Sequence, residues 1–405
     1  MRPFAHRRIV LGVTGGIASY KSAWLARLLS TAGAEVDVVM TAAAQEFVGP
    51  VTFEALTGRP VHTALIAAGH ALDHIALARA AHAIVVAPAT ADFMARAAHG
   101  RADDLLAACL LAADAPVLVV PAMNDRMWAH RQTVRNAAHL RGLGYHMLDP
   151  DVGPLAAGEG QGAGRMPEPE TIFAQIGRLL DGDGLLRGRR VLVTAGPTRE
   201  PIDPVRFLSN RSSGKMGIAI AAAAWRRGAD VTLVAGPLAV PVPIGPTLVS
   251  VETTDQMRAA VAEHLPTADV LVMAAAPADF RPATVAPRKI KKSAAPEAIS
   301  VVPTDDILVS TRELRSSSAL VVGFALETEA ALAGGRAKLR GKSLDLVVVN
   351  DASEPGAGFG TDTNRVSFLV GQGDGEGEVE DLPLLAKADV ADAILDRLEG
   401  LMRGR

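Results

Sequence analysis

The sequence contains a single cysteine, Cys109, among 405 residues. One thiol cannot form an internal disulfide or a zinc site with several thiolates, so we expect a reducing compartment, the cytoplasm. The charges almost cancel, since 41 Lys and Arg face 44 Asp and Glu and leave a net charge of −3. This balance argues against a protein-wide field that attracts nucleic acid or an anionic membrane.

Aromatic residues are also scarce, at 4% of the chain, whereas 49% of the residues are hydrophobic and 21% are charged. The cores must therefore be built from Ala, Val and Leu, which suits buried parallel strands covered by helices. No apolar run reaches the roughly 18 residues of a membrane span. Residues 9–18 follow basic residues as in a secretion signal, but Gly12, Gly15 and Gly16 interrupt the run and favour a first strand and turn.

Apolar runs alternate with helical periodicity along both halves of the chain, which predicts parallel sheets with helical crossovers. In the first half we expect strands at 8–13, 35–41, 81–87, 116–121 and 145–148, and helices at 17–32, 91–98, 103–113, 131–141 and 169–180. In the second half we expect strands at 191–195, 230–235, 247–251, 269–275, 320–326, 344–350 and 366–370, and helices at 214–227, 254–264, 329–340 and 386–401.

The glycine-rich stretch 151–166 breaks this alternation and predicts a mobile loop of the kind that covers active sites. A second break near residue 187 has the composition of a linker. The fold class is therefore α/β, with two tandem three-layer domains at 1–186 and 187–405.

Val13-Thr14-Gly15-Gly16-Ile17 lies between the first predicted strand and helix. Small residues there let backbone N–H groups approach a phosphate at the positive end of the helix, although a tight turn that binds no ligand would have the same sequence pattern. Thr41 and the segment 87–90 follow two other predicted strands. Because ligands of open α/β sheets bind at the carboxyl ends of strands, these three segments predict one ligand crevice.

The segment 121–128, Pro-Ala-Met-Asn-Asp-Arg-Met-Trp, follows another predicted strand. With residues 15–18, the His74-Ile75 pair and residues 87–92, it resembles the homo-oligomeric flavin-containing cysteine decarboxylases. The resemblance spans most of residues 8–175 and implies a flavodoxin-like fold that binds FMN. The positions it carries over are Gly15, Gly16, Ile17, Thr41 and Thr90 around FMN, His74 as catalytic base, Asn124 on the substrate carboxylate and Met127 in the substrate pocket.

These residue types suit the chemistry that the resemblance implies. Oxidising a cysteine thiol to a thioaldehyde creates an electron sink for decarboxylation, a flavin accepts the hydride, and a neutral His removes the thiol proton. Taken singly, His74 could be a structural histidine and Asn124 a helix N-cap.

The chain departs from this family at two positions. Ala157 stands where the family carries a lid cysteine that returns a proton to the enethiolate product, and Asp103 stands where it usually has Asn. Cys109 lies in an apolar predicted helix and is expected to be buried. Glu159 or bulk water could supply the proton instead, and a slow or inactive flavin-binding domain is the alternative.

Ser212-Ser213-Gly214-Lys215 opens a predicted helix in the second half. Its N–H groups and cation suit a phosphate, although a capped helix with a solvated Lys would read the same. It is not a P-loop, because that motif needs Gly where Ser209 stands and Ser or Thr where Met216 stands. The basic run 288–292 lacks interleaved aromatic residues, so we interpret it as a triphosphate clamp and not a nucleic-acid site.

Residues 194–203, 206–217 and 274–280 resemble phosphopantothenate–cysteine ligase, and the likeness extends over 190–395. The two halves in this order look like the bacterial bifunctional coenzyme A biosynthesis family. The resemblance implies that CTP and Mg²⁺ activate 4′-phosphopantothenate as an acyl-cytidylate, that cysteine displaces CMP, and that the first domain decarboxylates the product to 4′-phosphopantetheine.

Site residues of the second domain are carried over by position. Asn210 would hold the acyl-cytidylate, and Lys289 would bind the nucleotide and stabilise charge on its phosphate. The other expected nucleotide contacts are Ala275, Asp279, Asp306, Ile307, Phe324, Lys338 and Lys342. Metal ligands cannot be assigned. The resemblance also implies a homo-oligomer of flavin-domain trimers, with the pocket between protomers, and ligase-domain dimers.

Two other functions remain open at this point. A nicotinamide-dependent oxidoreductase would need Gly-x-Gly-x-x-Gly, but residues 12–17 read Gly-Val-Thr-Gly-Gly-Ile. A flavin-binding or regulatory module without turnover is the second, and Ala157 is its best support.

Overall fold

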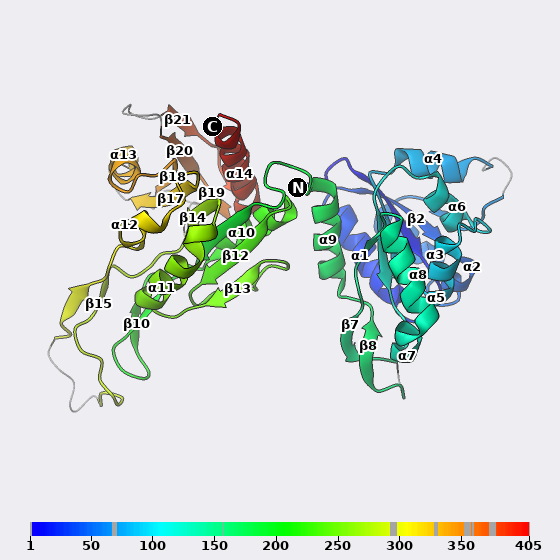
Figure 1. Ribbon diagram of the computed structural model, residues 1–405, viewed down its shortest axis with the longest axis horizontal. Helices are drawn as coiled ribbons and strands as arrows, with labels where there is room; N and C mark the ends of the chain where they lie inside the picture. Colours follow the sequence, from blue (N-terminus) through cyan, green and yellow to red (C-terminus); the bar gives the residue numbers. More distant parts are fainter. Residues whose placement is uncertain are drawn as a thin grey trace. The chain divides into compact units, whose positions relative to one another are not determined.

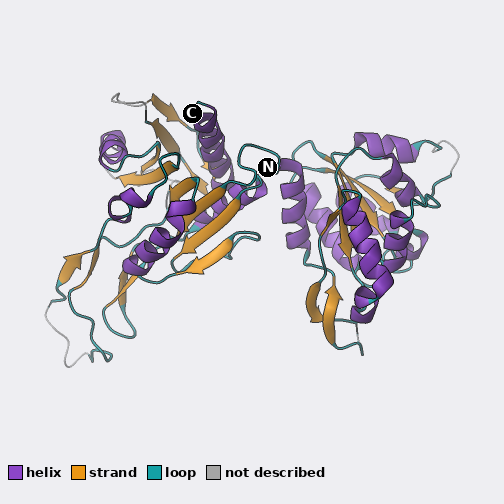
Figure 2. Ribbon diagram, viewed as in Figure 1, coloured by secondary structure: helices purple, strands orange, loops and turns teal. Residues whose placement is uncertain are grey.

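The computed structural model describes residues 2–66, 71–156, 158–291, 298–327, 331–351, 358, 360–371 and 378–404. Ala157 and Lys292 lie outside these residues. The chain divides into two compact units, Met1–Asp181 and Gly182–Arg405, each with helices on both faces of a sheet (Figures 1 and 2). In the described residues no helix has the length and apolar character to cross a membrane.

The first unit is built on a parallel sheet of six strands in the order β3-β2-β1-β4-β5-β6. The strands are β1 (Arg8–Val13), β2 (Glu35–Met40), β3 (Val61–His62), β4 (Ala83–Ala89), β5 (Val117–Pro121) and β6 (His146–Met147). One face is covered by α1 (Ser19–Thr31), α3 (Pro50–Thr57) and α9 (Pro169–Asp181). The other is covered by α4 (Asp73–Ala80), α5 (Ala91–Ala98), α6 (Leu105–Ala112) and α8 (Arg131–Gly142).

The side chains of β1 show why both faces are filled. Ile9, Leu11 and Val13 pack against α1 and α9, whereas Val10 packs against the helices of the opposite face. Strands buried on both sides have continuous apolar sequences, which is the pattern that predicted a parallel sheet. The α/β class is confirmed for this unit.

The sequence missed several short elements of the first unit, among them α2 (Ala42–Gln45), α3, β3, α4 and α7 (Asp125–Ala129). The prediction of a loop at 151–166 was wrong, since β7 (Asp151–Pro154) and β8 (Gln161–Arg165) form an antiparallel hairpin. Its glycines allow close packing: a Cβ on Gly164 would lie 2.1 Å from the carbonyl oxygen of Met123. The glycines that suggested irregularity thus seat a strand against the loop before α7.

The second unit contains a sheet of eight strands in the order β13-β12-β9-β14-β17-β18-β20-β21. The strands are β9 (Arg190–Ala195), β12 (Asp230–Ala235), β13 (Thr247–Ser250), β14 (Val270–Met273), β17 (Leu320–Glu327), β18 (Leu346–Asp351), β20 (Val366–Val370) and β21 (Glu378–Asp381). Pairing is parallel from β13 to β18 and antiparallel at β20 and β21. The predicted strands and helices of this half are therefore present, and the α/β class is confirmed here too.

Helices α10 (Lys215–Arg226) and α14 (Lys387–Arg403) cover one face of this sheet. Helices α11 (Thr254–His264), α12 (Ile307–Ser310) and α13 (Ala331–Gly341) lie on the other. Two small antiparallel pairs extend away from the sheet, β10 (Arg199–Pro201) with β11 (Phe207–Ser209), and β15 (Phe280–Pro282) with β16 (Val301–Pro303) (Figure 1). A third pair joins β19 (Thr363–Asn364) to β22 (Leu385–Ala386), and short 3₁₀ turns span Leu265–Thr267 and Arg312–Leu314.

A buried charge network joins α10 to α14. The Arg227 guanidinium lies 2.9 Å from Oδ1 of Asp392 and 2.8 Å from Oδ1 of Asp396, and Asp392 also pairs with Arg226. Arg227 and Asp392 are both buried. Such a pair fixes how the two helices meet, because removing either partner leaves a buried charge uncompensated.

We therefore expect Asp392→Ala to lower the free energy of unfolding of the second unit by roughly 3 kcal/mol, the low end for breaking a buried pair, because Asp396 still compensates part of the charge. This loss is measured by unfolding the enzyme in denaturant, with ligase activity as the probe of the folded second unit. Asp389→Ala, at an exposed position of the same helix, is the control and should cost less than about 1 kcal/mol. Equal losses in the two variants would contradict the assignment.

Candidate active sites

A cavity of about 420 Å³ opens where β1, β4 and β5 end. The turn after β1, the segments after β4 and β5, and the β7–β8 hairpin contribute its walls. The lining residues are Gly15–Lys21 apart from Ser19, Pro88, Thr90, Ala91, Ala122–Asn124, Met127, Pro154–Ala156, Glu159 and Gly164–Met166. Of the three segments that the sequence predicted to converge, the turn after β1 and the segment 87–90 do so, whereas Thr41 does not line the cavity.

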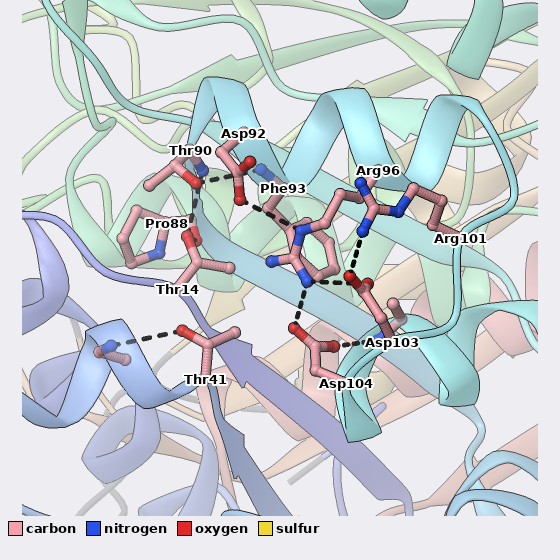
Figure 3. A network of polar contacts seen from close by, with 12 residues as sticks. Thr14, Thr41, Pro88, Thr90, Asp92, Phe93, Arg96, Arg101, Asp103 and Asp104 are labelled. Atoms are coloured by element: carbon pink, nitrogen blue, oxygen red, sulfur yellow. Dashed lines mark hydrogen bonds and ion pairs between the residues drawn. The ribbon is translucent and has the colours of Figure 1, made fainter. Parts of the chain in front are cut away.

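The turn after β1 is fixed by a hydroxyl group. Thr14 Oγ1 donates to the carbonyl of Pro88 (2.7 Å) and accepts from the backbone N–H of Thr90 (3.1 Å) (Figure 3). Gly15 has no room for a side chain, since a Cβ would lie 2.4 Å from that of Ala43, whereas a Cβ on Gly16 would meet only open space and Thr90. The result is a rigid turn with an open side at the start of α1, as phosphate binding requires.

Thr41 has a different place from the one expected. Its side chain is buried and caps α2, accepting a hydrogen bond from the backbone of Ala44. Thr90 caps α5 and lines the cavity, and Ile17 lines it while remaining 67% exposed. The turn after β1 and Thr90 therefore line this cavity, whereas Thr41 does not.

Asn124 and Met127 line the same cavity. Asn124 also caps α7, because its Oδ1 accepts from the backbone N–H of Arg126 at 2.9 Å. The capping role and the cavity position thus coexist, and the cap holds the side chain at the cavity wall.

His74 lies elsewhere, on α4. It lines a separate open cavity of about 560 Å³ together with the apolar side chains of Leu65, Ile66, Ile75 and Leu111. Its Nδ1 is buried and has no hydrogen-bond partner among the described residues. Within a single chain, His74 and Asn124 therefore line different cavities.

Asp103 takes part in an ion-pair network (Figure 3) and is not among the residues that line the cavity. Arg96 of α5 bonds to Asp104 (2.6 Å) and Asp103 (3.3 Å), and Arg101 bonds to Asp103 (2.5 Å). Burial works against ionisation of Asp103, but the hydrogen bond from Arg96 helps to lower its pKa. Asp104 caps α6 through the backbone of Ala107. This departure from the family pattern thus ties α5 to α6 without touching the cavity.

The hairpin closes one side of the cavity. Its tip is a turn in which Leu155 N–H donates to the Gly160 carbonyl and Glu159 N–H to that of Ala156, both at 3.0 Å. Its base is held by the buried Lys21, whose Nζ donates to the Met166 carbonyl at 2.7 Å. Glu159 therefore stands on a short, anchored hairpin at the cavity.

Cys109 lies in α6 and is fully buried, as the sequence predicted. Burial, followed by the nearby Asp104 and Asp73 carboxylates, raises the pKa of its thiol to about 12. Such a thiol is inert at neutral pH and cannot replace a lid cysteine.

The second unit has two adjoining cavities at the carboxyl ends of β14 and β17, of about 400 and 310 Å³. They share Ala275, Asp279, Phe324 and Lys338. All seven expected nucleotide contacts other than Lys289 line the smaller one, namely Ala275, Asp279, Asp306, Ile307, Phe324, Lys338 and Lys342. The larger one carries Asn210 and the residues 212–216 at the start of α10.

Asn210 spans the larger cavity. Its Nδ2 donates to the carbonyls of Ala276 (3.2 Å) and Pro277 (2.9 Å), so the side-chain amide is fixed against the loop that carries Asp279. Lys215, expected to meet a phosphate, bonds instead to Asp362 (2.6 Å) and to the carbonyl of Gly360 (3.0 Å). That hydrogen bond lowers the pKa of Asp362. A ligand phosphate would have to compete with Asp362 for the Lys215 ammonium.

The loop 275–279 rests on buried polar residues that the sequence did not single out. Thr198 Oγ1 accepts from the backbone N–H of Ala278 (2.9 Å), and Thr304 Oγ1 donates to the carbonyl of the same residue (2.6 Å). Thr198 also meets Thr254, which bonds to the buried Glu200. Thr198 and Glu200 lie in the motif 194–203, but their partners are distant in sequence, so no local pattern could reveal the network.

An ion pair crosses the smaller cavity. Lys342 Nζ lies 2.6 Å from Oδ2 of Asp306, which also caps α12 by accepting from the backbone of Val309. Burial alone would favour the neutral acid, but the hydrogen bond from Lys342 and the cap lower the pKa of Asp306. The two charges therefore neutralise each other within the cavity.

Lys289 is exposed and lines neither cavity. The adjacent Ile290 is held on both sides of its peptide: its N–H donates to buried Asp203 (3.2 Å), and its carbonyl accepts from Arg206 (2.5 Å). Burial opposes ionisation of Asp203, but hydrogen bonds from Val205, Arg206 and Ile290 lower its pKa. Within the described residues, no cluster of three or more His, Cys, Asp or Glu side chains suits a metal ion.

Comparison with known proteins places both units. Residues 2–181 match the family model described as Flavoprotein, and residues 186–401 match the DNA/pantothenate metabolism flavoprotein C-terminal domain. A solved C-terminal domain of a coenzyme A biosynthesis bifunctional protein CoaBC is 40% identical, with a TM-score of 0.46, and covers 54% of this chain and 98% of its own. The FMN-dependent cysteine decarboxylase SpaF is 35% identical, with a TM-score of 0.35, and covers 40% of this chain and 91% of its own.

Similarity to curated relatives runs over almost the whole chain. The coenzyme A biosynthesis bifunctional protein CoaBC of Mycobacterium tuberculosis (strain ATCC 25618 / H37Rv) is 48% identical over 409 residues, 97% of each chain. That of Escherichia coli (strain K12) is 43% identical over 399 residues, again 97% of each chain. The chain therefore belongs to the family of bifunctional coenzyme A biosynthesis proteins, enzymes that combine phosphopantothenoylcysteine decarboxylase and phosphopantothenate–cysteine ligase activities.

Proposed function

We propose that residues 187–405 couple 4′-phosphopantothenate to cysteine with CTP and Mg²⁺, and that residues 1–186 bind FMN and decarboxylate the product, in the cytoplasm. The observation that carries the ligase assignment is the convergence of seven expected nucleotide contacts from four chain segments on one cavity. The adjoining cavity, with Asn210 and the start of α10, takes the phosphopantothenate end of the acyl-cytidylate.

Lys289 supplies charge to the phosphate that becomes part of the leaving group CMP. A cation there stabilises the transition state of cytidylate formation more than the ground state, because negative charge develops on the phosphate. Because Asp203 and Arg206 bond to the main chain of Ile290, they restrict how far the adjacent Lys289 side chain can reach.

Lys289→Gln should slow cytidylate formation about a hundredfold, since one lost charge contact in a closed site costs roughly 3 kcal/mol. Pyrophosphate release from CTP and phosphopantothenate, measured without cysteine, reports this half-reaction. Lys291→Gln, two residues on and equally exposed, is the matched control. If both variants keep the parent rate while decarboxylating normally, Lys289 has no such role.

The cavity of the first unit fits FMN. The open side of Gly16 and the start of α1 suit its phosphate, and apolar walls including Ile17, Ala122 and Met123 suit its ring. When bound, FMN supplies the oxidising power that makes the substrate an electron sink for decarboxylation. Asn124 holds the substrate carboxylate, and His74 takes the proton of the substrate thiol.

A second copy of the chain supplies His74 to this cavity. The support is that His74 and Asn124 line separate cavities of one chain, and that His74 is surrounded by strongly exposed apolar side chains, with Ile66 87%, Leu72 70% and Leu111 56% exposed. Packing such a surface against another protomer removes apolar area from water and completes the constellation. This agrees with flavin-domain trimers. Exposed Phe207, Phe280 and Val301 on the projecting strand pairs favour dimers of the ligase domain.

His74→Asn should keep the yellow flavin but release no carbon dioxide, because a base is needed for thiol oxidation and not for binding the ring or phosphate. Exposed His139→Asn is the control. Co-expressing His74→Asn with Asn124→Asp should restore activity at about a quarter of the sites, where both parental residues meet across an interface. Recovery of none would place His74 and Asn124 in the same subunit's site or outside the reaction.

The decarboxylation consumes one proton, because hydrogen replaces the carboxylate: HS–CH₂–CH(COO⁻)–NH–R + H⁺ gives HS–CH₂–CH₂–NH–R + CO₂. Glu159 is the sole carboxyl group among the described residues that line the cavity. It stands on the anchored hairpin two positions after Ala157. We therefore assign Glu159 as the proton donor.

Glu159→Gln should slow product formation roughly 10²–10⁴-fold, the usual contribution of a general acid. In single-turnover absorbance measurements, flavin reduction should proceed normally and reoxidation should stall. Adding Ala157→Cys to this variant should restore reoxidation by providing an alternative acid. Reoxidation at the parent rate in Glu159→Gln would show that water is the donor.

A further inference from the structure

We infer that Arg315 is a positioning residue for the nucleotide end of the ligase site, because its guanidinium joins the two helices that carry Asp306 and Lys342. This inference rests on the proposed nucleotide role of that cavity. Asp306 and Ile307 begin α12, whereas Lys338 and Lys342 lie on or just after α13. Strand β17 separates α12 from α13 in the chain, so no local backbone connection fixes their spacing.

Arg315 contacts the main chain at the ends of both helices. Nη1 donates to the carbonyls of Lys342 (3.0 Å) and Ser343 (3.2 Å), and Nη2 donates to the carbonyl of Leu308 in α12. Carbonyls at helix C-termini lack intrahelical partners and attract cations. A planar guanidinium can satisfy several of them in a fixed geometry, which a lysine cannot.

The turn that Arg315 holds is an unfavourable one. Ser343 has φ of +49°, in the left-handed region, and Arg312 bonds to its hydroxyl while Arg315 bonds to its carbonyl. A non-glycine residue persists in this conformation only when its surroundings enforce it. This turn directly follows Lys342, so the clamp determines where the Lys342 side chain starts.

A second link between the two helices lies across the cavity and is of a different kind. It is the Asp306–Lys342 ion pair, which a ligand phosphate must compete with for the Lys342 ammonium. Arg315 instead bonds to main-chain carbonyls and does not itself line either cavity. When a nucleotide breaks the Asp306–Lys342 ion pair, the Arg315 bonds remain and preserve the spacing of α12 and α13.

Stability alone explains the placement of Arg315 poorly. Its Nε is buried without a hydrogen-bond partner among the described residues, which costs free energy. Burial, followed by the neighbouring charge of Arg312, lowers the pKa of Arg315. The position of this cation is better explained by the three carbonyls to which it bonds and whose spacing it fixes.

The test uses the full-length enzyme with Arg315→Met, Arg315→Lys and Arg312→Met. Arg315→Met should raise the KM for CTP about tenfold, the equivalent of one hydrogen bond with a charged donor, and change kcat by less than about twofold. Arg315→Lys should fall between it and the parent. Arg312→Met, which loses only the Ser343 hydroxyl contact, should stay near the parent. Decarboxylation by the same chain is the internal control for protein integrity.

A rise of the KM for cysteine and phosphopantothenate equal to that for CTP would overturn the inference, as would a loss confined to kcat. Lys342→Met, measured in parallel, distinguishes the proposed nucleotide role of the cavity from the positioning role of Arg315. If it leaves the KM for CTP unchanged, the proposed nucleotide role of the cavity fails. If it raises that KM while Arg315→Met does not, the cavity assignment stands and the role of Arg315 is refuted.

Discussion

Parallel strand pairing is the constraint on which both catalytic units depend. Parallel neighbours need helical crossovers, so the parallel strands of each central sheet end at the same edge, and the loops that follow must pack together there. In the first unit Thr14, after β1, bonds to the backbone that follows β4. In the second unit Thr194, at the end of β9, accepts from the backbone N–H of Ala275 after β14. One hydroxyl thus holds the first two loops of each site in place.

Ion pairs compensate the charges of two lysines at the cavities of the second unit. Lys215 pairs with Asp362 and Lys342 pairs with Asp306, so a carboxylate offsets the positive charge of each ammonium group. In the proposed reaction, a nucleotide or phosphate exchanges one anion for another at each lysine, so its affinity is a difference between two ion pairs. Buried supports such as Thr198 and Glu200 keep the loop 275–279 fixed during that exchange.

Each unit also keeps one expected catalytic group away from the cavity it would serve. His74 lines a separate apolar cavity, and Lys289 is exposed on a segment that Asp203 and Arg206 hold. For His74, assembly of several chains offers an explanation, because exposed Ile66 and Leu111 line the same cavity. The proposed mechanism then becomes a property of the oligomer.

The sequence by itself determined the elements whose signals are local. Ala91–Ala98, Asp230–Ala235, Thr254–His264 and Val366–Val370 have the predicted bounds, because apolar periodicity and capping residues act within a few positions. The match of residue types to a family also indicated which side chains gather at the smaller cavity of the second unit. Only the tertiary structure decided that β7 and β8 form a hairpin, that Thr41 caps α2 and does not line the crevice, and that His74 lies apart from Asn124. The seat of the hairpin depends on contacts between residues far apart in the chain, such as Gly164 against Met123, and no local pattern records such contacts.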